Sequence, residues 1–421
     1  MNILITSNIK NKYKFKIFPD NNIIINVNQM SNMELKKYIN KLENIKKIYD
    51  DIKIINVVFH NNMDNEMKNM SILSLLHNIY YEYYTKKVKI NLLNVQKNLT
   101  YYMDEMVLYK DIVMHPNKTT DIYLNYIIHN TPNTYDNKIF LLKPNDMFPL
   151  TYAVNKGSKH NSYFVHIFPK NNNIQYKNIY LVGKAVVYDS GGMNLKDNSM
   201  KDMKIDMTGS AMLLSVLKLL HNNKVDNDLN IHLLFPIVEN LIGSTATKPG
   251  TVVKSMSNKT VEIDNTDAEG RLCIVDAIDY VNLYLINLEH KNLIIDVATL
   301  TGNTFSITSG HSCISMSNKA GFKFINKLIS IGEELCEYVD YLYLRDEYLK
   351  VLDSNVADIK SININNKSGC VLAGTFISYF CNKTIPWIHL DVASVVYDDE
   401  KTKCFGVNLL YYFLLYVKFN L

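Results

Sequence analysis

Two acids and an arginine stand at alternate positions in the stretch Asn265-Thr266-Asp267-Ala268-Glu269-Gly270-Arg271-Leu272. The stretch lies between a strand-like segment, 260–263, and a long apolar run. Alternate side chains of an extended segment point the same way, so Asp267, Glu269 and Arg271 are expected to converge where a helix begins. Two adjacent carboxylates repel each other, and a metal ion or another cation relieves the repulsion. By itself the stretch fits a solvated acidic turn that caps the helix as well as it fits a metal site.

Further charged residues stand upstream, at the ends of predicted core elements. Lys184 interrupts the otherwise apolar predicted strand 179–188, where a lysine must be neutral or paired unless it snorkels from a sheet edge. Asp189 closes that strand, at the end where open α/β sheets gather their ligands, and Lys196 follows in the same loop. Asp206 stands just ahead of an apolar helix, where a single aspartate is more often a cap than a ligand.

Together these positions supply four carboxylates, two lysines and one arginine within one domain. An oxygen-rich set of this kind suits hard or borderline divalent ions, and bridging carboxylates let two ions sit close together. No histidine or cysteine cluster accompanies the set, which argues against a structural zinc site. His389, in a predicted core strand, is expected to be a hydrogen-bonded structural residue. The residue types therefore favour a site for two metal ions.

The elements that must position these residues form an α/β pattern with two domains. Residues 1–115 alternate strand and helix signals, which predicts a small N-terminal accessory α/β domain. Its strands are expected at 22–27, 52–59 and 88–95, and its helices at 33–49 and 63–84. Four of the nine prolines fall within 116–149, which is predicted to be a linker region around one helix at 120–129.

Residues 150–421 are predicted to form a larger catalytic α/β domain. Its predicted strands are nearly continuous apolar runs, which indicates a central, mostly parallel mixed sheet covered by helices. The strands are expected at 179–188, 229–238, 293–297 and 387–392. The helices are expected at 208–220, 272–288, 324–338 and 371–380, with a terminal packing helix over 409–417.

Composition restricts the class of protein and its compartment. A chain of 421 residues with 47% hydrophobic and 20% charged residues is typical of soluble globular proteins. A net charge of +4 argues for neither nucleic acid nor membrane as a partner, and the longest apolar run is too short to span a bilayer. Six scattered cysteines and the absence of a signal-like start predict a cytoplasmic protein with reduced thiols.

From about residue 130 to the end, the motifs resemble, in type and order, the leucyl aminopeptidase (cytosol aminopeptidase) family. The stretch 265–272, NTDAEGRL, is the signature of that family and makes the resemblance highly specific. The other motifs that carry it are Val182-Gly183-Lys184, Asp189-Ser190-Gly191-Gly192, Asp296-Val297-Ala298-Thr299-Leu300-Thr301-Gly302, Asp353-Ser354-Asn355-Val356-Ala357-Asp358, Ala373-Gly374 and Trp387-Ile388-His389-Leu390-Asp391.

The resemblance implies a metallo-exopeptidase, a hydrolase that removes leucine and other apolar residues from the N-termini of short peptides through a water activated by two metals. The ions would be zinc or manganese, with cobalt or magnesium as alternatives. Asp189 and Glu269 would bridge them. Lys184 and Asp206 would complete the tighter site, and Asp267 would complete the more exchangeable one.

The resemblance also implies roles around the metals. Lys196 would polarise the substrate carbonyl and stabilise the gem-diolate, and Arg271 would anchor a bicarbonate that acts as general base. The pocket for the N-terminal residue would be lined by Met203, Asn265, Thr299, Leu300 and Gly302. The family assembles as a homohexamer, a dimer of trimers whose active sites face an interior cavity, and the same assembly is expected here.

Two other functions compete with this hypothesis. A non-catalytic family member could serve as a scaffold or a DNA-binding regulator, but all five expected ligands, Lys196 and Arg271 are present and no basic stripe supports DNA binding. A metal-dependent phosphatase or nuclease would share the acids without needing the NTDAEGRL order. Departures from the family pattern, such as Thr208 where a glycine is usual and Thr251 where an acid is usual, leave every expected ligand in place.

Overall fold

The computed structural model describes most of the chain beyond residue 97 and five short strands before it. The described residues are 2–6, 15–17, 22–26, 54–59, 89–93, 97–144, 147–171, 177–198, 200–365, 368–398 and 401–421. The helices predicted at 33–49 and 63–84 lie outside these residues. Within them, no helix combines the length and the apolar character that crossing a membrane requires.

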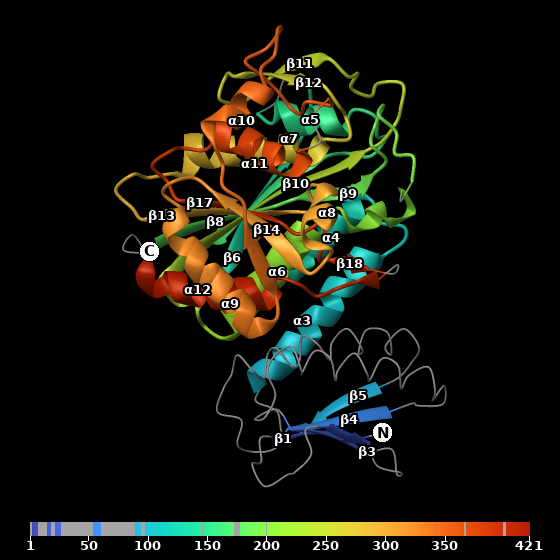
Figure 1. The fold of residues 1–421 in the computed structure, drawn as a ribbon, viewed down its shortest axis with the longest axis vertical. Coiled ribbons are helices and arrows are strands. Elements are labelled where there is room, and N and C mark those ends of the chain that lie inside the picture. Colours follow the sequence, from blue (N-terminus) through green and yellow to red (C-terminus); the bar gives the residue numbers. More distant parts are fainter. Residues whose placement is uncertain are drawn as a thin grey trace.

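The five N-terminal strands form a sheet of their own, in the order β2-β3-β1-β4-β5 (Figure 1). β2 is antiparallel to β3, and the remaining pairs are parallel. The strands predicted at 22–27, 52–59 and 88–95 are confirmed to within two residues. The bounds are β1 Asn2–Thr6, β2 Phe15–Ile17, β3 Asn22–Asn26, β4 Ile54–Phe59 and β5 Lys89–Leu93.

A nine-stranded sheet forms the centre of the larger part, in the order β15-β14-β17-β13-β8-β10-β7-β6, with β9 also paired to β10. The four central strands β17, β13, β8 and β10 are parallel, which confirms the mostly parallel mixed sheet. β6 falls within the predicted linker region and pairs with β7 at the sheet edge. The bounds are β6 Tyr135–Leu141, β7 Tyr163–Pro169, β8 Lys177–Gly183, β9 Ala185–Asp189, β10 Leu229–Asn240, β13 Asn292–Ala298, β14 Ser312–Ser317, β15 Tyr338–Tyr341 and β17 Trp387–Asp391.

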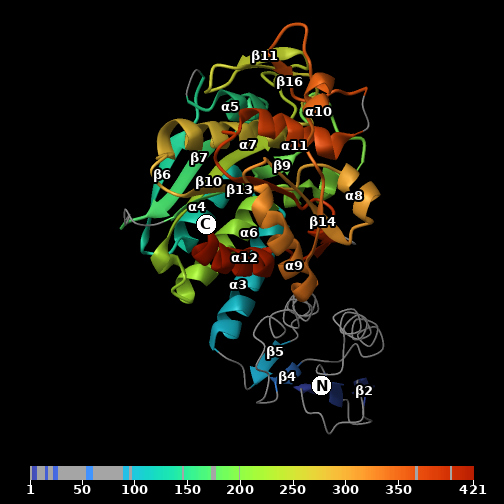
Figure 2. The ribbon, with the colours of Figure 1, turned by 60° about the vertical axis from the view of Figure 1, so that its left-hand side comes forward.

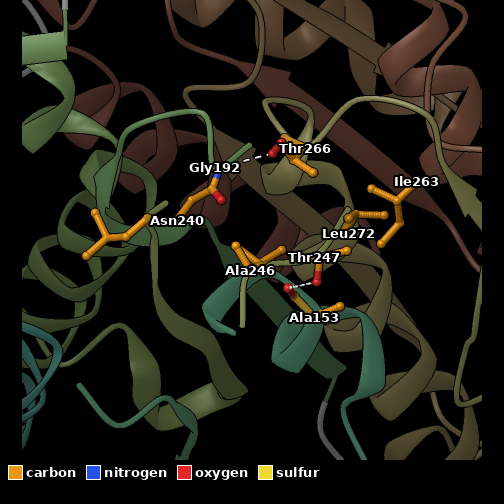
Figure 3. Close-up of a pocket in the computed structure, with 10 residues that line it drawn as sticks. Ala153, Gly192, Asn240, Ala246, Thr247, Ile263, Thr266 and Leu272 are labelled. Carbon is orange, nitrogen blue, oxygen red and sulfur yellow. Dashed lines mark hydrogen bonds between the residues drawn. The ribbon is translucent and has the colours of Figure 1, made fainter. Parts of the chain in front are cut away.

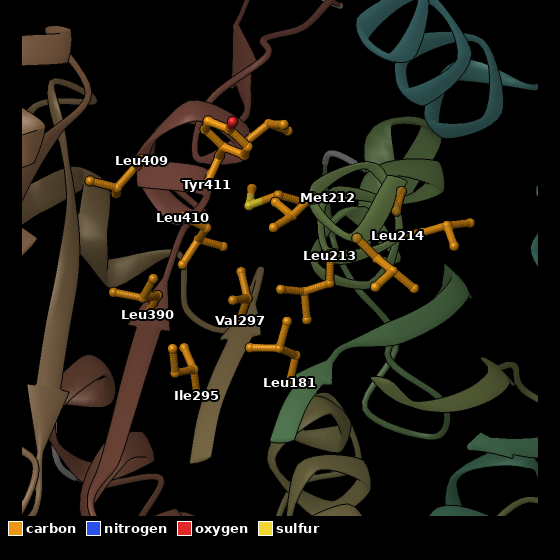
Figure 4. Close-up of a cluster of buried hydrophobic side chains, with 14 of the residues drawn as sticks. Leu181, Met212, Leu213, Leu214, Ile295, Val297, Leu390, Leu409, Leu410 and Tyr411 are labelled. Atoms are coloured by element: carbon orange, nitrogen blue, oxygen red, sulfur yellow. The ribbon is translucent and has the colours of Figure 1, made fainter. Parts of the chain in front are cut away.

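Helices cover both faces of this sheet because alternate side chains of each strand point to opposite faces. On β13, Ile295 and Val297 belong to the hydrophobic core of one face, whereas Ile294 and Ala298 belong to that of the other. Figure 4 shows the first core, in which Ile295 and Val297 face Met212, Leu213 and Leu410 of the covering helices. Helices on that face are α3 Lys97–Met114, α4 Thr120–Asn130, α6 Thr208–Asn222, α9 Ile325–Leu335 and α12 Val407–Asn420.

The opposite face carries α5 Pro149–Asn155, α7 Glu269–Tyr280 and α11 Gly369–Phe380. Shorter elements surround the ends of the sheet (Figures 1 and 2). They are the strands β11 Thr251–Lys254, β12 Thr260–Ile263, β16 Ile359–Lys360, β18 Tyr397–Asp398 and β19 Lys401–Thr402, and the helices α8 Asn303–Thr308 and α10 Asp346–Val351. Short 3-10 helices are η2 Met200–Ile205, η3 Asp226–Asp228 and η5 Phe322–Phe324, and η4 Val281–Leu285 is a π-helical segment.

Three predicted elements differ from the observed ones at points that the backbone conformation marks. The strand predicted at 179–188 is two strands, because the carbonyl of Lys184 accepts a hydrogen bond from Ser210 N of α6 instead of continuing the ladder. The helix predicted at 272–288 begins at Glu269 and ends at Tyr280, where a π-helical turn follows. The helix predicted at 324–338 ends at Leu335, because Cys336 takes a left-handed conformation with φ 58°.

Candidate metal centre

The residues predicted to bind metal gather at the carboxyl ends of the central parallel strands. Lys184 lies in the break between β8 and β9, and Asp189 is the last residue of β9. Thr299 follows β13, Asp206 lies just ahead of α6, and Glu269 begins α7. These elements are widely separated in the chain, so the fold of the sheet brings the side chains together.

Asp267, Glu269 and Arg271 reach this region from a helix start and not from an extended segment. Asp267 lies in a turn and α7 begins at Glu269, so the prediction that the three residues alternate on extended backbone is wrong. Their side chains diverge accordingly: Glu269 Oε1 lies 2.8 Å from Lys184 Nζ, whereas Arg271 Nη1 donates to Ser361 O at 2.8 Å. All three nevertheless line one cleft.

Lys184 is buried among acceptors. Its Nζ lies 2.7 Å from Asp206 Oδ2 and 2.8 Å from Glu269 Oε1, and donates to the carbonyl of Thr299 at 2.8 Å. Burial alone would lower the pKa of Lys184, but Asp206, Glu269 and Asp189 raise it above its usual value. The ammonium group of Lys184 is therefore stabilised by the surrounding carboxylates, and its side chain does not reach solvent.

Lys196 lies on the outer side of the same cluster. Its Nζ is 2.7 Å from Asp189 Oδ2 and 2.6 Å from Asp267 Oδ1. Burial opposes its charge, but Asp189, Glu269 and Asp267 raise the pKa of Lys196 above the usual value. Because its side chain is more exposed than that of Lys184, 16% against 3%, it is the lysine that faces the cleft.

The carboxylates lie so close together that Lys184 and Lys196 do not neutralise their combined negative charge. Oxygen atoms of Asp189, Asp267 and Glu269 all lie within 4.8 Å of one another. Burial and the neighbouring Glu269 raise the pKa of Asp189 to about 7, although Lys196 opposes the shift. Burial likewise raises the pKa of Asp206 well above its usual range, against the effect of Lys184. For Glu269 burial is outweighed by Lys184 and Lys196, which lower its pKa.

A tight loop and a neighbouring strand hold Asp189 in place. Its Oδ1 accepts hydrogen bonds from Gly191 N and from Asn240 Nδ2, both at 2.8 Å. Gly191 and Gly192 have φ of 89° and 65°, a region that favours glycine, and a side chain at Gly192 would come within 2.7 Å of Asn240 Oδ1. Figure 3 shows Asn240, Gly192 and Thr266 around a cavity of about 10 Å³ behind this loop, which is far too small for a substrate.

Arg271 is buried with unused hydrogen-bonding capacity. Its side chain lines the cleft, the residue is 3% exposed, and Nε has no hydrogen-bond partner among the described residues. Burial lowers the pKa of Arg271 to about 10, although Glu269 and Asp391 oppose the shift. At neutral pH the guanidinium stays charged and can take a planar anion.

The cleft itself has a volume of about 560 Å³. It brings together all twelve residues predicted for the site: Lys184, Asp189, Lys196, Met203, Asp206, Asn265, Asp267, Glu269, Arg271, Thr299, Leu300 and Gly302. Thr299 does more than line it, because its hydroxyl donates to Asp206 Oδ1 at 2.7 Å while its carbonyl accepts from Lys184.

Sequence reasoning missed several supporting residues. Asn240, at the end of β10, holds Asp189 and also donates to the carbonyl of Thr266 at 3.0 Å. It follows the predicted strand 229–238 by two residues, on the side where ligands of open α/β sheets gather, and that position is a usable signal. Asp202 and Tyr397 also line the cleft and are joined by a 2.6 Å hydrogen bond across 195 residues, which no local pattern reveals. His389 is a hydrogen-bonded core residue as predicted, with Nδ1 2.5 Å from Asp296 Oδ1.

The donor set fits divalent cations. Four carboxylates face two lysines in a buried space, so the cluster has an excess of negative charge that a cation would neutralise. Glu269 Oε2 is buried and has no hydrogen-bond partner among the described residues, as a free ligand atom would. Carboxylate oxygens suit magnesium, manganese and zinc, and a donor set of four carboxylates and a lysine does not favour softer ions.

Comparison with known proteins places the chain in a family. A family model described as the cytosol aminopeptidase family, catalytic domain, matches residues 134–411. A probable cytosol aminopeptidase of Vesicomyosocius okutanii is 38% identical over 267 residues, which is 62% of this chain and 53% of the relative. One from Nitrosospira multiformis is 35% identical over 306 residues, 71% of this chain and 57% of the relative.

The alignments span little more than half the length of these curated relatives. A solved leucine aminopeptidase of Caenorhabditis elegans superposes with a TM-score of 0.84 over 99% of this chain and 95% of that one, at 23% identity, which shows a shared fold. Because the family model matches well over half of its length, this chain belongs to the cytosol aminopeptidase family.

Proposed function

We propose that the protein is a metal-dependent aminopeptidase, a hydrolase that removes an N-terminal residue, preferably leucine or another apolar residue, from short peptides. The observation that carries the proposal is the convergence of Asp189, Asp206, Asp267 and Glu269 with two lysines in one cleft. The matched family model and the named relatives support an aminopeptidase, and the donor set supports two divalent ions.

The metal-binding roles follow from position in the cluster. Asp189 and Glu269 would bridge two ions, Lys184 and Asp206 would complete the more buried site, and Asp267, which is the most exposed of the acids, would serve the exchangeable one. Zinc or manganese is the proposed metal, with cobalt or magnesium as alternatives. When bound, such ions supply a nucleophilic water at neutral pH and neutralise charge on the peptide carbonyl.

The remaining residues act on the substrate and on protons. Lys196, charged and facing the cleft, would donate a hydrogen bond to the carbonyl oxygen as negative charge develops there. Arg271 would hold bicarbonate through its planar guanidinium, next to the acids, where that anion can accept a proton. Met203, Leu300 and Gly302 would contact the apolar N-terminal side chain.

We also propose a homohexameric, cytoplasmic enzyme with peptides as its substrates. Exposed apolar side chains near the cleft, Met193, Leu195 and Phe305, are candidates for burial between subunits. The mass of the purified protein in solution tests the assembly, and a monomer under assay conditions would refute it.

The decisive experiment measures hydrolysis of leucine 7-amido-4-methylcoumarin before and after adding zinc or manganese to chelator-treated protein. The proposal expects metal-restored activity in the wild type. It expects none in Asp206→Ala or Glu269→Ala variants whose circular dichroism spectra match the wild type. An inactive wild type loaded with two metals, or an active Glu269→Ala variant, would overturn it.

A further inference from the structure

A second cavity adjoins the metal cleft. Its volume is about 510 Å³, and it shares Asn303 and Gly369 with the cleft as lining residues. The cavity lies between α8, the loop that follows β15, α10 and the start of α11. α11 packs against both α8 and α10. Asn303 and Gly369 form the boundary that the groove and the cleft share.

Among the described residues that line it, the groove carries a positive charge and no acid. Arg345 lines it, and the other lining residues include no aspartate or glutamate. No acidic side chain pairs with Arg345 among the described residues, although the exposed Asp346 and Glu347 follow it in α10. The amino terminus of the twelve-residue helix α11 contributes further partial positive charge at Gly369. An anion that enters the groove would therefore meet an unneutralised guanidinium.

Arg345 stands out in a chain that uses lysine almost everywhere else. Of its 45 lysines and arginines only Arg271 and Arg345 are arginines. A lysine ammonium serves any surface role that needs only charge, whereas the planar guanidinium fork binds a carboxylate through two parallel hydrogen bonds. Arg271 lines the cleft and Arg345 lines the adjoining groove, so both guanidinium groups lie in neighbouring cavities.

The wall beside Arg345 is aromatic and fixed. Tyr341 and Tyr343 pack edge to face with ring centroids 4.8 Å apart, and both also contact Phe322. Tyr341 is held by a 3.1 Å hydrogen bond with Ser317, while Tyr343 lines the groove and is 57% exposed. A rigid aromatic surface next to a free arginine suits an extended peptide that ends in a carboxylate.

We propose that this groove receives the C-terminal part of the substrate and that Arg345 binds its terminal carboxylate, so that the enzyme selects short peptides with a free C-terminus. The inference rests on the proposed aminopeptidase function and adds a determinant of substrate choice to it. Because Arg345 contacts the substrate equally before and during the reaction, its effect falls on KM more than on kcat.

The test compares Leu-Gly, Leu-Gly-Gly and Leu-Gly-Gly-Gly, each as the free acid and as the C-terminal amide. For the peptide whose C-terminus reaches Arg345, the wild-type kcat/KM should be about tenfold higher for the free acid than for the amide. One charge-assisted bidentate contact accounts for a ratio of that size. Arg345→Gln should bring that ratio to about one through KM, and Arg345→Lys should retain part of it. Lys350→Gln, an exposed cation of α10 outside the groove, is the matched control and should keep the wild-type ratio.

Leucine 7-amido-4-methylcoumarin has no carboxylate, so Arg345→Gln should hydrolyse it at the wild-type rate. An active enzyme with an acid-to-amide ratio near one at every length would overturn the inference and leave the proposed function standing. An acid-to-amide ratio in Arg345→Gln equal to that of the wild type would also overturn the inference and leave the proposed function standing. Failure of the wild type to hydrolyse any of these substrates with metal present would refute the proposed function, and the inference with it.

Discussion

Gly270 lets Lys184 occupy its place in the metal cluster. A Cβ built on Gly270 would lie 2.4 Å from Lys184 Cε and 2.7 Å from Nζ, whereas ordinary contacts begin at 3.4 Å. Gly270→Ala must therefore push the end of Lys184 by about 1 Å. The lysine has no free direction to yield, because Asp206, Glu269 and the carbonyl of Thr299 surround its Nζ. Ligand distances in a metal site tolerate only about 0.2 Å.

The displacement should weaken metal binding without unfolding the protein. We expect the affinity of the more buried site to fall 10- to 100-fold, about 1.4 to 2.7 kcal/mol, as when other groups that position metal ligands are lost. Alanine favours helix more than glycine does at this first turn of α7, so the melting temperature should change little. Isothermal titration calorimetry with zinc or manganese on chelator-treated protein measures the affinity, and elemental analysis measures the metal content.

Gly302→Ala is the matched control. Gly302 lines the same cleft, but a Cβ there meets nothing within 4 Å and its φ is −64°. The control should bind both metals with wild-type affinity. Two metals bound by Gly270→Ala at wild-type affinity would show that Lys184 does not need its present position. An equal loss in Gly302→Ala would show that the effect is not specific to Lys184.

Three further predictions concern catalysis and stability. Lys196→Ala should reduce turnover at least 100-fold while metal content stays near the wild-type value, because Lys196 faces the cleft beside the ligands; the opposite pattern would make it a ligand. Burial lowers the pKa values of His166 and His232, whose rings share a 3.0 Å hydrogen bond, to about 3 and about 4. The unfolded chain takes up these protons below about pH 6.5 and the folded protein does not, so the free energy of unfolding should fall by ~3 kcal/mol at pH 5.5 relative to pH 8. Urea denaturation of the wild type and of a His166→Phe/His232→Leu variant should show this pH dependence only in the wild type, and equal slopes would contradict the assignment. Glu337→Ala should lower the free energy of unfolding by about 1 to 3 kcal/mol, because Glu337 Oε2 accepts 3.0 Å hydrogen bonds from Gly406 N and Leu409 N at the start of α12; unchanged chemical denaturation would refute this capping role.

Much of the architecture was accessible from local patterns. Apolar runs such as 229–238 and 293–297 predict buried parallel strands because a strand covered on both faces has no polar side. Residue chemistry likewise singled out Lys184 and Asp189, since a charge inside or at the end of an apolar strand needs a partner. The NTDAEGRL stretch identified the family that the comparisons confirm.

The sequence by itself therefore determined the α/β class, the candidate ligands and the family, because hydrophobic periodicity and residue type are properties of short segments. Only the tertiary structure decided where the strand breaks at Lys184, since Ser210 of α6 supplies the competing hydrogen bond. It also decided that Asn240 and Thr299 hold the acids, and that Arg345 lines a groove that adjoins the cleft. These features arise from contacts between segments distant in sequence, and no local periodicity encodes which distant partner a polar group will meet.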